Sequence, residues 1–307
     1  MKQITFYEFA SLCADAYHPS TRAFGTFENV QHVLPTSTLN GFQAVVFRRD
    51  NGESFDWVIS IAGTRVRSFD FSGAPFQDII NNLYTLKYDV INDTLYADFG
   101  IPSENQVVSL YNNYIGNQAI IVSHYSGDPT ASLGNIYARD KMDAFLRDIW
   151  QRCRLILESE VYSGMCVIDD IQKKVGAKDR LFLAGHSLGG ALEQMLCAYT
   201  GISGVAISAP PVSQIGDVIE SRWKNTRARV VCLRIVPGDL IDVTWPLGSF
   251  IGEVVDLYSP RHGFGAHSID STATELKNEP LGMQDPFNLP YVFNPAQVRI
   301  YPVPSGR

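Results

Sequence analysis

Residues 181–192 are Leu181-Phe182-Leu183-Ala184-Gly185-His186-Ser187-Leu188-Gly189-Gly190-Ala191-Leu192. The first four are apolar, which is typical of a fully buried strand. After the glycine-rich turn, apolar residues recur at helical spacing as far as Ala198, so we expect a helix that ends near Gly201. The sequence therefore predicts a strand, a sharp turn and a helix in direct succession.

The turn between this strand and this helix has the pattern Gly-x-Ser-x-Gly, which holds a serine hydroxyl above the end of a sheet. Gly185 and Gly189 suit such a turn because a Cβ at either position would collide with neighbouring backbone. The first N–H groups of the helix, including that of Leu188, point at negative charge that forms beside Ser187. The pattern alone is weak, since glycine and serine are common and a chance match in a loop is the alternative. With a strand before it and a helix after it, Ser187 becomes a candidate nucleophile and Leu188 a candidate oxyanion donor.

The string Gly-His-Ser-Leu-Gly-Gly-Ala-Leu also resembles the nucleophile motif of the class 3 lipases, a group of α/β-hydrolases. In that family, a strand ending in Gly-Thr or Gly-Ser supplies the other half of the oxyanion hole. The strand-like residues 57–61 run into Gly63-Thr64, so the resemblance implies that the Thr64 N–H faces the oxyanion beside the Leu188 N–H. Many members carry an arginine before that glycine, whereas this chain has Ala62. The alternative is a strand that ends in a plain turn.

Length and composition favour a soluble globular chain. Its 307 residues are enough to bury a sizeable core, as one large α/β domain or two small ones. A net charge of −7 argues against general nucleic-acid binding, which needs a basic surface. No segment has the uninterrupted apolar run of a secretory signal or a membrane-spanning helix. We expect synthesis as a soluble cytoplasmic protein, and secretion without a leader stays open.

The five cysteines are odd in number and scattered along the chain. Cys166 and Cys197 fall in apolar helical patterns, which favours buried reduced thiols over a disulfide framework. No spacing of cysteine and histidine resembles a zinc site. We therefore expect neither a metal nor another cofactor.

The remaining apolar patterns predict the rest of a single domain over residues 1–307. A first helix is expected at 5–17, and the hairpin signal Asp50-Asn51-Gly52 joins strand-like runs at 44–47 and 57–61. A crossover helix within 139–174 leads into the nucleophile strand, and further strands follow at 204–208, 229–236 and 297–301. Successive βα units favour a doubly wound sheet. The predicted class is an α/β-hydrolase fold, with a mostly parallel central sheet flanked by helices.

Residues 65–137 separate the candidate oxyanion loop from the nucleophile strand and are rich in aromatic side chains. We expect part of this region to be a helical cap or lid insertion that lines an acyl pocket or opens at a lipid surface. The alternative is an ordinary packed subdomain, because aromatic residues at helical spacing usually belong to a core.

A serine is a poor nucleophile unless a histidine takes its proton and a carboxylate orients that histidine. In α/β-hydrolases these partners follow the serine in the order acid, then histidine. Asp239 follows an apolar strand and resembles the family's acid, with Asp242 as the alternative. Only His262 and His267 lie downstream of either aspartate, and a His-Ser pattern in the family favours His267. His262 stays open.

His186 is excluded as the base, because a direct neighbour of Ser187 on so sharp a turn points elsewhere; we expect it to pack behind the serine. The resemblance implies hydrolysis of a lipid or other acyl ester through an acyl-enzyme on Ser187, with Asp239 and His267 completing the triad. A phospholipase A-type enzyme in peripheral contact with membranes, an acyltransferase and an amidase would use the same residues. A non-catalytic binding module on the same fold is a further alternative.

Overall fold

The structure is a computed structural model that describes residues 2–17, 25–34, 42–63, 160–212, 228–239, 241, 250–289 and 298–301. The expected cap or lid insertion at 65–137 lies outside these residues. Thr64 and Asp242 lie outside them too.

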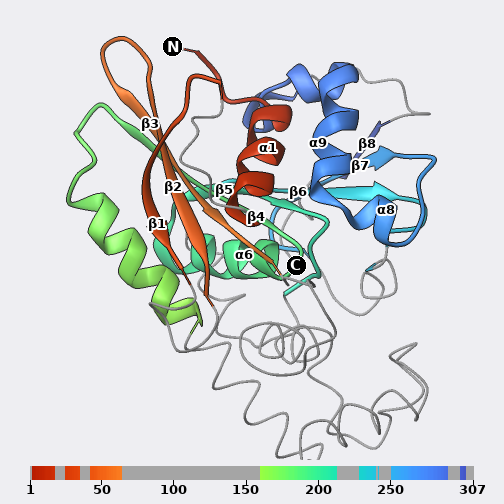
Figure 1. Cartoon of the computed structure of the whole chain (residues 1–307), viewed down its shortest axis with the longest axis horizontal. Helices are drawn as coiled ribbons and strands as arrows, with labels where there is room; N and C mark the ends of the chain where they lie inside the picture. The colour runs from red at the N-terminus through yellow and green to blue at the C-terminus, as the bar shows by residue number, and fades with distance from the viewer. Residues whose placement is uncertain are drawn as a thin grey trace, which may run out of the picture.

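The described residues form an eight-stranded sheet that runs through the middle of the molecule (Figure 1). Five central strands are parallel: β3 (Phe55–Ile61), β4 (Arg180–His186), β5 (Ser203–Ile207), β6 (Val230–Val236) and β7 (Glu253–Tyr258). The antiparallel strands lie toward the edges: β1 (Glu28–Val33), β2 (Ala44–Asp50) and β8 (Val298–Tyr301). The strands expected at 44–47, 57–61, 181–184, 204–208, 229–236 and 297–301 are thereby confirmed, whereas β1 and β7 were not expected. The expectation that residues 181–184 are fully buried is wrong for Leu181 and Phe182, which are half-buried.

The order of the strands across the sheet follows their order in the chain, from β1 to β8. A doubly wound sheet would reverse direction at its centre, so the doubly wound order expected from the sequence is wrong. Successive βα units require parallel strands, and they leave open which neighbour each new strand joins.

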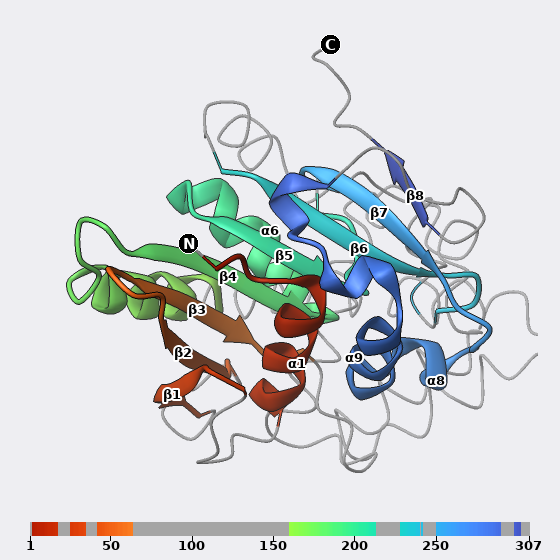
Figure 2. The same cartoon turned by 90° about the horizontal axis from the view of Figure 1, so that it is seen from above.

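Helices cover both faces of the sheet, as Figure 2 shows from above. Helices α1 (Phe6–Tyr17) and α9 (Ile269–Asn278), from opposite ends of the chain, lie side by side on one face. Helix α6 (Leu188–Thr200) and the helical residues 160–172 pack on the other face. A mostly parallel sheet between two helical layers, with a strand–turn–helix at its centre, is an α/β-hydrolase fold, as predicted.

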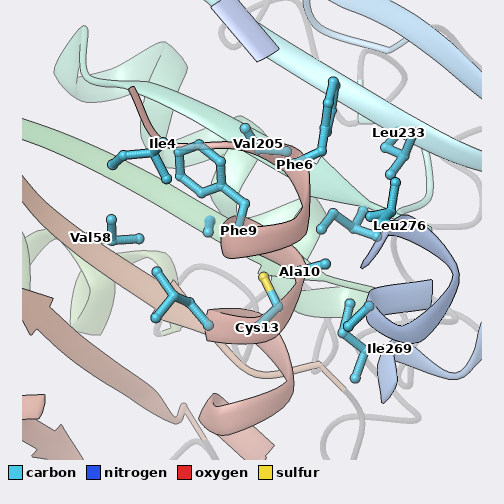
Figure 3. Packing of buried hydrophobic residues seen from close by; sticks show 14 of the residues in the cluster. Ile4, Phe6, Phe9, Ala10, Cys13, Val58, Val205, Leu233, Ile269 and Leu276 are labelled. Atoms are coloured by element: carbon cyan, nitrogen blue, oxygen red, sulfur yellow. The ribbon is translucent and has the colours of Figure 1, made fainter. Parts of the chain in front are cut away.

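The face under α1 and α9 shows why the first helix forms where the sequence predicts it. Its buried side chains recur at helical spacing and meet apolar residues of the sheet and of α9 (Figure 3). Burying each large side chain contributes about 1.5–3 kcal/mol. The labelled members of this cluster are Ile4, Phe6, Phe9, Ala10, Cys13, Val58, Val205, Leu233, Ile269 and Leu276. This packing fixes the C-terminal end of α1 over the ends of the central strands.

The predicted hairpin between β2 and β3 is confirmed, with Gly52 at φ +94°. Cys166 and Cys197 are both free thiols, as expected. The expected burial holds for Cys197 and is wrong for Cys166, which is exposed. On a helix Cys166 lies about 200° from Ile168, which faces the core. The apolar residues beside Cys166 in sequence therefore do not share its face.

Helix α6 carries a carboxyl group into the core beneath the sheet. Glu193 is fully buried, and its Oε1 accepts a hydrogen bond from Cys197 Sγ at 2.9 Å. Burial raises the pKa of the Glu193 carboxyl from 4.5 to about 8, although the Cys197 hydrogen bond lowers it. Folded Glu193 is therefore protonated at pH 7, whereas the unfolded chain exposes an ionised carboxylate.

Stability should consequently fall as the pH rises. Between pH 4.5 and 8 the unfolded state binds fewer protons at this position than the folded state. The contribution of neutral Glu193 is fully present below pH 4.5 and is lost as pH rises toward 8, by up to about 1.4 kcal/mol per unit. The free energy of unfolding of Glu193→Gln, measured with urea, should therefore rise on the order of 3 kcal/mol relative to that of wild type as the pH goes from 5 to 8.

The matched control is Glu53→Gln, which removes a carboxyl whose side chain is 91% exposed. Its free energy of unfolding should stay close to that of wild type, because the exposed side chain is not buried on folding. Parallel pH curves for wild type and Glu193→Gln would contradict the assignment of a neutral buried carboxyl.

Candidate active site

The Gly-x-Ser-x-Gly turn lies at the carboxyl end of β4, where the chain turns into α6. Ser187 has φ 58° and ψ −128°, a strained conformation for a residue other than glycine. Its backbone is held on both sides: Ser187 N donates to Ile207 O at 3.0 Å, and Gly190 N donates to Ser187 O at 2.9 Å. The neighbouring strand and the first turn of the helix thus maintain the strain.

The two glycines of the motif are required by close packing of backbone on backbone. A Cβ on Gly185 would lie 2.1 Å from Gly189 O. A Cβ on Gly189 would lie 2.3 Å from Ile61 O, at the end of β3. Gly189 O cannot move without moving the turn, and Ile61 O cannot move without moving the end of β3.

Gly189→Ala should therefore destabilise the protein by about 3 kcal/mol, because overpacking against backbone cannot be relieved by a side-chain rotation. Gly265→Ala is the control, since a Cβ there meets nothing within 4 Å. Urea denaturation of both variants measures the difference. Equal losses of stability would show that the turn tolerates a methyl group.

Two loops meet above the end of β6 and bring an aspartate and a histidine together. Gly263 N donates to Gly238 O at 2.6 Å, and Asp239 forms an isolated parallel bridge with Gly263. The short helix α8 (Phe264–His267) follows, and His267 N donates to Gly263 O at 3.0 Å. Ser268 then caps α9 through its side chain. His267 is thus held between two helices and directly above the loop that carries Asp239.

The side chains of Ser187, Asp239 and His267 form one line of hydrogen bonds. His267 Nδ1 lies 2.7 Å from Asp239 Oδ1, and His267 Nε2 lies 2.9 Å from Ser187 Oγ. An ionised carboxylate only accepts, so Nδ1–H donates to Asp239 and Nε2 accepts the hydroxyl proton of Ser187. Asp239 Oδ1 also accepts from Ile241 N at 3.1 Å. This arrangement can take a proton from Ser187 and stabilise the imidazolium that results.

The competing candidate for the base, His262, lies elsewhere. His262 is exposed, and its ring lies against Gly238, where a Cβ would be 2.3 Å from His262 Nδ1. Within the described ranges it makes no hydrogen bond to Ser187 or Asp239. Among the described histidines, His267 is the one that reaches both residues.

One of the two candidate oxyanion donors is described. Leu188 is buried and is the first residue of α6, so its N–H has no partner within the helix. Gly63, the residue before Thr64, lies close to the turn, because a Cβ on it would be 2.8 Å from Ser187 Cβ. The end of β3 and the start of α6 therefore flank Ser187 on two sides.

Two residues near Ser187, His186 and Tyr17, make hydrogen bonds that the sequence did not predict. His186 is buried, and its ring lies between the Tyr17 hydroxyl, 2.6 Å from Nδ1, and the His267 carbonyl oxygen, 2.8 Å from Nε2. The sequence predicted packing of His186 near the serine. No local sequence pattern indicated a role for Tyr17, which lies 169 residues before His186 in the chain.

In the described part of the chain, no three His, Cys, Asp or Glu side chains gather as a metal ion would require. None of the helices found there is long and apolar enough to cross a bilayer.

No protein-family model matches the chain, and no curated protein matches its sequence. The solved structures similar to it include a triacylglycerol lipase from Penicillium expansum, with 12% identity, a TM-score of 0.37, and coverage of 83% of this chain and 77% of that one. The Lip2 lipase from Yarrowia lipolytica has 13% identity, a TM-score of 0.34, and coverage of 82% and 77%. Lipase II from Rhizopus niveus has 12% identity, a TM-score of 0.36, and coverage of 83% and 80%. At these values the likeness does not bear on what this chain binds or transforms.

Proposed function

We propose that this protein is a serine hydrolase that cleaves carboxylic esters of lipids. One observation carries the proposal. The hydroxyl of Ser187, on a strained turn, lies 2.9 Å from Nε2 of His267, and Nδ1 of the same imidazole is hydrogen-bonded to the buried carboxylate of Asp239. An isolated serine on a loop needs neither the strain nor the two partners. Together they provide the groups that acyl transfer requires.

Each residue has a definite step. His267 Nε2 takes the proton of Ser187 as Oγ attacks the ester carbonyl, and Asp239 stabilises the imidazolium. The Leu188 N–H, with that of Thr64, stabilises the negative oxygen of the tetrahedral intermediate. His267 then returns the proton to the departing alcohol, which leaves an acyl group on Ser187. A water molecule deprotonated by His267 attacks the acyl carbon, and His267 returns that proton to Ser187 Oγ as the carboxylic acid leaves.

The lipid part of the proposal rests on the class 3 lipase motif at residues 185–192. On the same ground we propose membership of that family, with 65–137 as the cap or lid insertion over Ser187. A triacylglycerol or another lipid ester is then the expected substrate.

The test compares wild type with Ser187→Ala on p-nitrophenyl butyrate, p-nitrophenyl palmitate, triacylglycerol emulsions and phosphatidylcholine vesicles. We expect hydrolysis of the long-chain esters and the triacylglycerol, lost in the variant. Preference for the vesicles would make the enzyme a phospholipase instead. Failure of the folded wild type to hydrolyse any of these esters would overturn the proposal.

A further inference from the structure

A continuous row of hydrogen bonds passes behind Ser187 and joins four separate parts of the chain. Tyr17, the last residue of α1, has its hydroxyl oxygen 2.9 Å from Gly63 N and 2.6 Å from His186 Nδ1. On the other side of the ring, His186 Nε2 lies 2.8 Å from the carbonyl oxygen of His267. The row therefore runs from the end of β3 to the loop that carries the proposed base.

The chemistry of the partners fixes the direction of each hydrogen bond. A carbonyl oxygen only accepts, so the hydrogen of His186 is on Nε2 and is donated to His267 O. Nδ1 of the neutral ring is then an acceptor, and it takes the hydroxyl hydrogen of Tyr17. The oxygen of Tyr17 accepts in turn from Gly63 N. Burial, and then electrostatic repulsion from His267 whenever that ring is protonated, hold the pKa of His186 well below its ordinary value, which agrees with a neutral ring.

The row ends on groups that adjoin the reacting atoms. Gly63 precedes the candidate oxyanion donor Thr64, His186 precedes Ser187, and the carbonyl belongs to His267 itself. The rings of His186 and His267 are also in contact, with centroids 4.9 Å apart. A shift of about 1 Å in any of these segments can cost a factor of about 10² in rate.

We propose that Tyr17 and His186 are positioning residues, which together hold Gly63, after β3, and His267, at the end of α8, in register with Ser187. The inference rests on the proposed function, since it assigns these residues to the alignment of that same site. The bland alternative is that the row only satisfies buried polar groups, as almost all buried polar groups are satisfied. If these residues position the site, removing a hydrogen bond should slow the chemistry while stability is retained. If they only satisfy polar groups, stability should fall and the rate of the folded enzyme should stay the same.

Tyr17→Phe keeps the ring and removes the hydroxyl, so Gly63 N and His186 Nδ1 both lose this partner. We expect kcat for p-nitrophenyl butyrate to fall about tenfold with KM unchanged. The second-order rate of labelling by a fluorophosphonate, which reports the reactivity of Ser187 without any natural substrate, should fall by the same factor. The control is Ser11→Ala, which removes from α1 a buried hydroxyl that donates to Tyr7 O at 2.8 Å.

Two variants of His186 separate the halves of the row. In His186→Asn the side-chain amide can stand near the Nδ1 position and still meet Tyr17, whereas the bond to His267 O is lost. In His186→Gln the amide can reach the Nε2 position and keep the bond to His267. Both should lower the labelling rate, and Tyr17→Phe combined with His186→Asn should cost less than the product of the two single effects, because both interrupt one row.

The outcomes distinguish this inference from the function it rests on. The positioning role is supported if the fluorophosphonate labels the wild type and labels Tyr17→Phe about ten times more slowly, while Tyr17→Phe and Ser11→Ala have the same Tm. Equal labelling rates for wild type, Tyr17→Phe and Ser11→Ala would overturn it and leave the serine hydrolase intact. A folded wild type that no fluorophosphonate labels would overturn the proposed function, and this inference with it.

Discussion

Replacing Ser187 by alanine should lower kcat for ester hydrolysis on the order of 10⁶-fold, because the attacking oxygen disappears and with it the acyl-enzyme route. The loss should appear in kcat with little change in KM, since the hydroxyl contributes to chemistry more than to binding. Steady-state hydrolysis of p-nitrophenyl butyrate measures both. Retention of more than a few per cent of wild-type activity would exclude Ser187 as the nucleophile.

Ser187→Gly is the companion variant, because it separates loss of activity from loss of structure. At φ 58° and ψ −128° a glycine has no Cβ penalty. Relief of the backbone strain should raise the free energy of unfolding by about 1 kcal/mol, while activity disappears. An inactive yet more stable protein would show that the strained conformation of Ser187 lowers the free energy of unfolding and is kept for catalysis.

Replacing His267 by alanine should be almost as damaging, again on the order of 10⁶-fold in kcat, because serine, histidine and aspartate act as one unit. Its hydrogen bonds to Ser187 Oγ and Asp239 Oδ1 would both vanish. The matched control is His262→Ala, five residues earlier on the same loop. Its exposed ring touches Gly238 and should change kcat less than threefold. The opposite ranking of the two variants would transfer the role of base to His262.

Much of this fold follows from local sequence. The apolar run at 181–184 and the glycines on either side of Ser187 predict β4, the turn and α6, although Ile207 and the end of β3 then hold the turn in place. The hairpin at Asp50-Asn51-Gly52 is equally local. The order of strands across the sheet is not, because several arrangements satisfy the same βα units, and the doubly wound one was wrong.

The candidate site also has a part that the sequence predicts and a part that it does not. The serine stands out through its own turn, and chain order leaves few choices for its two partners, which the structure brings together with it. Their catalytic roles stay predictions, as do those of Leu188 and Thr64. The row through Tyr17 could not be anticipated, because it depends on where α1 ends after packing over the sheet, and no short sequence pattern encodes that contact.

The central claim is that the line from Asp239 through His267 makes one hydroxyl, that of Ser187, unusually reactive. Labelling with a fluorophosphonate, followed by mass spectrometry of the tryptic peptide 181–222, tests it most directly. Fragment ions must distinguish Ser187 from the other serines of that peptide. We expect a single adduct on Ser187 in the wild type and none in His267→Ala. An adduct on another residue, or no adduct on the folded wild type, would contradict it.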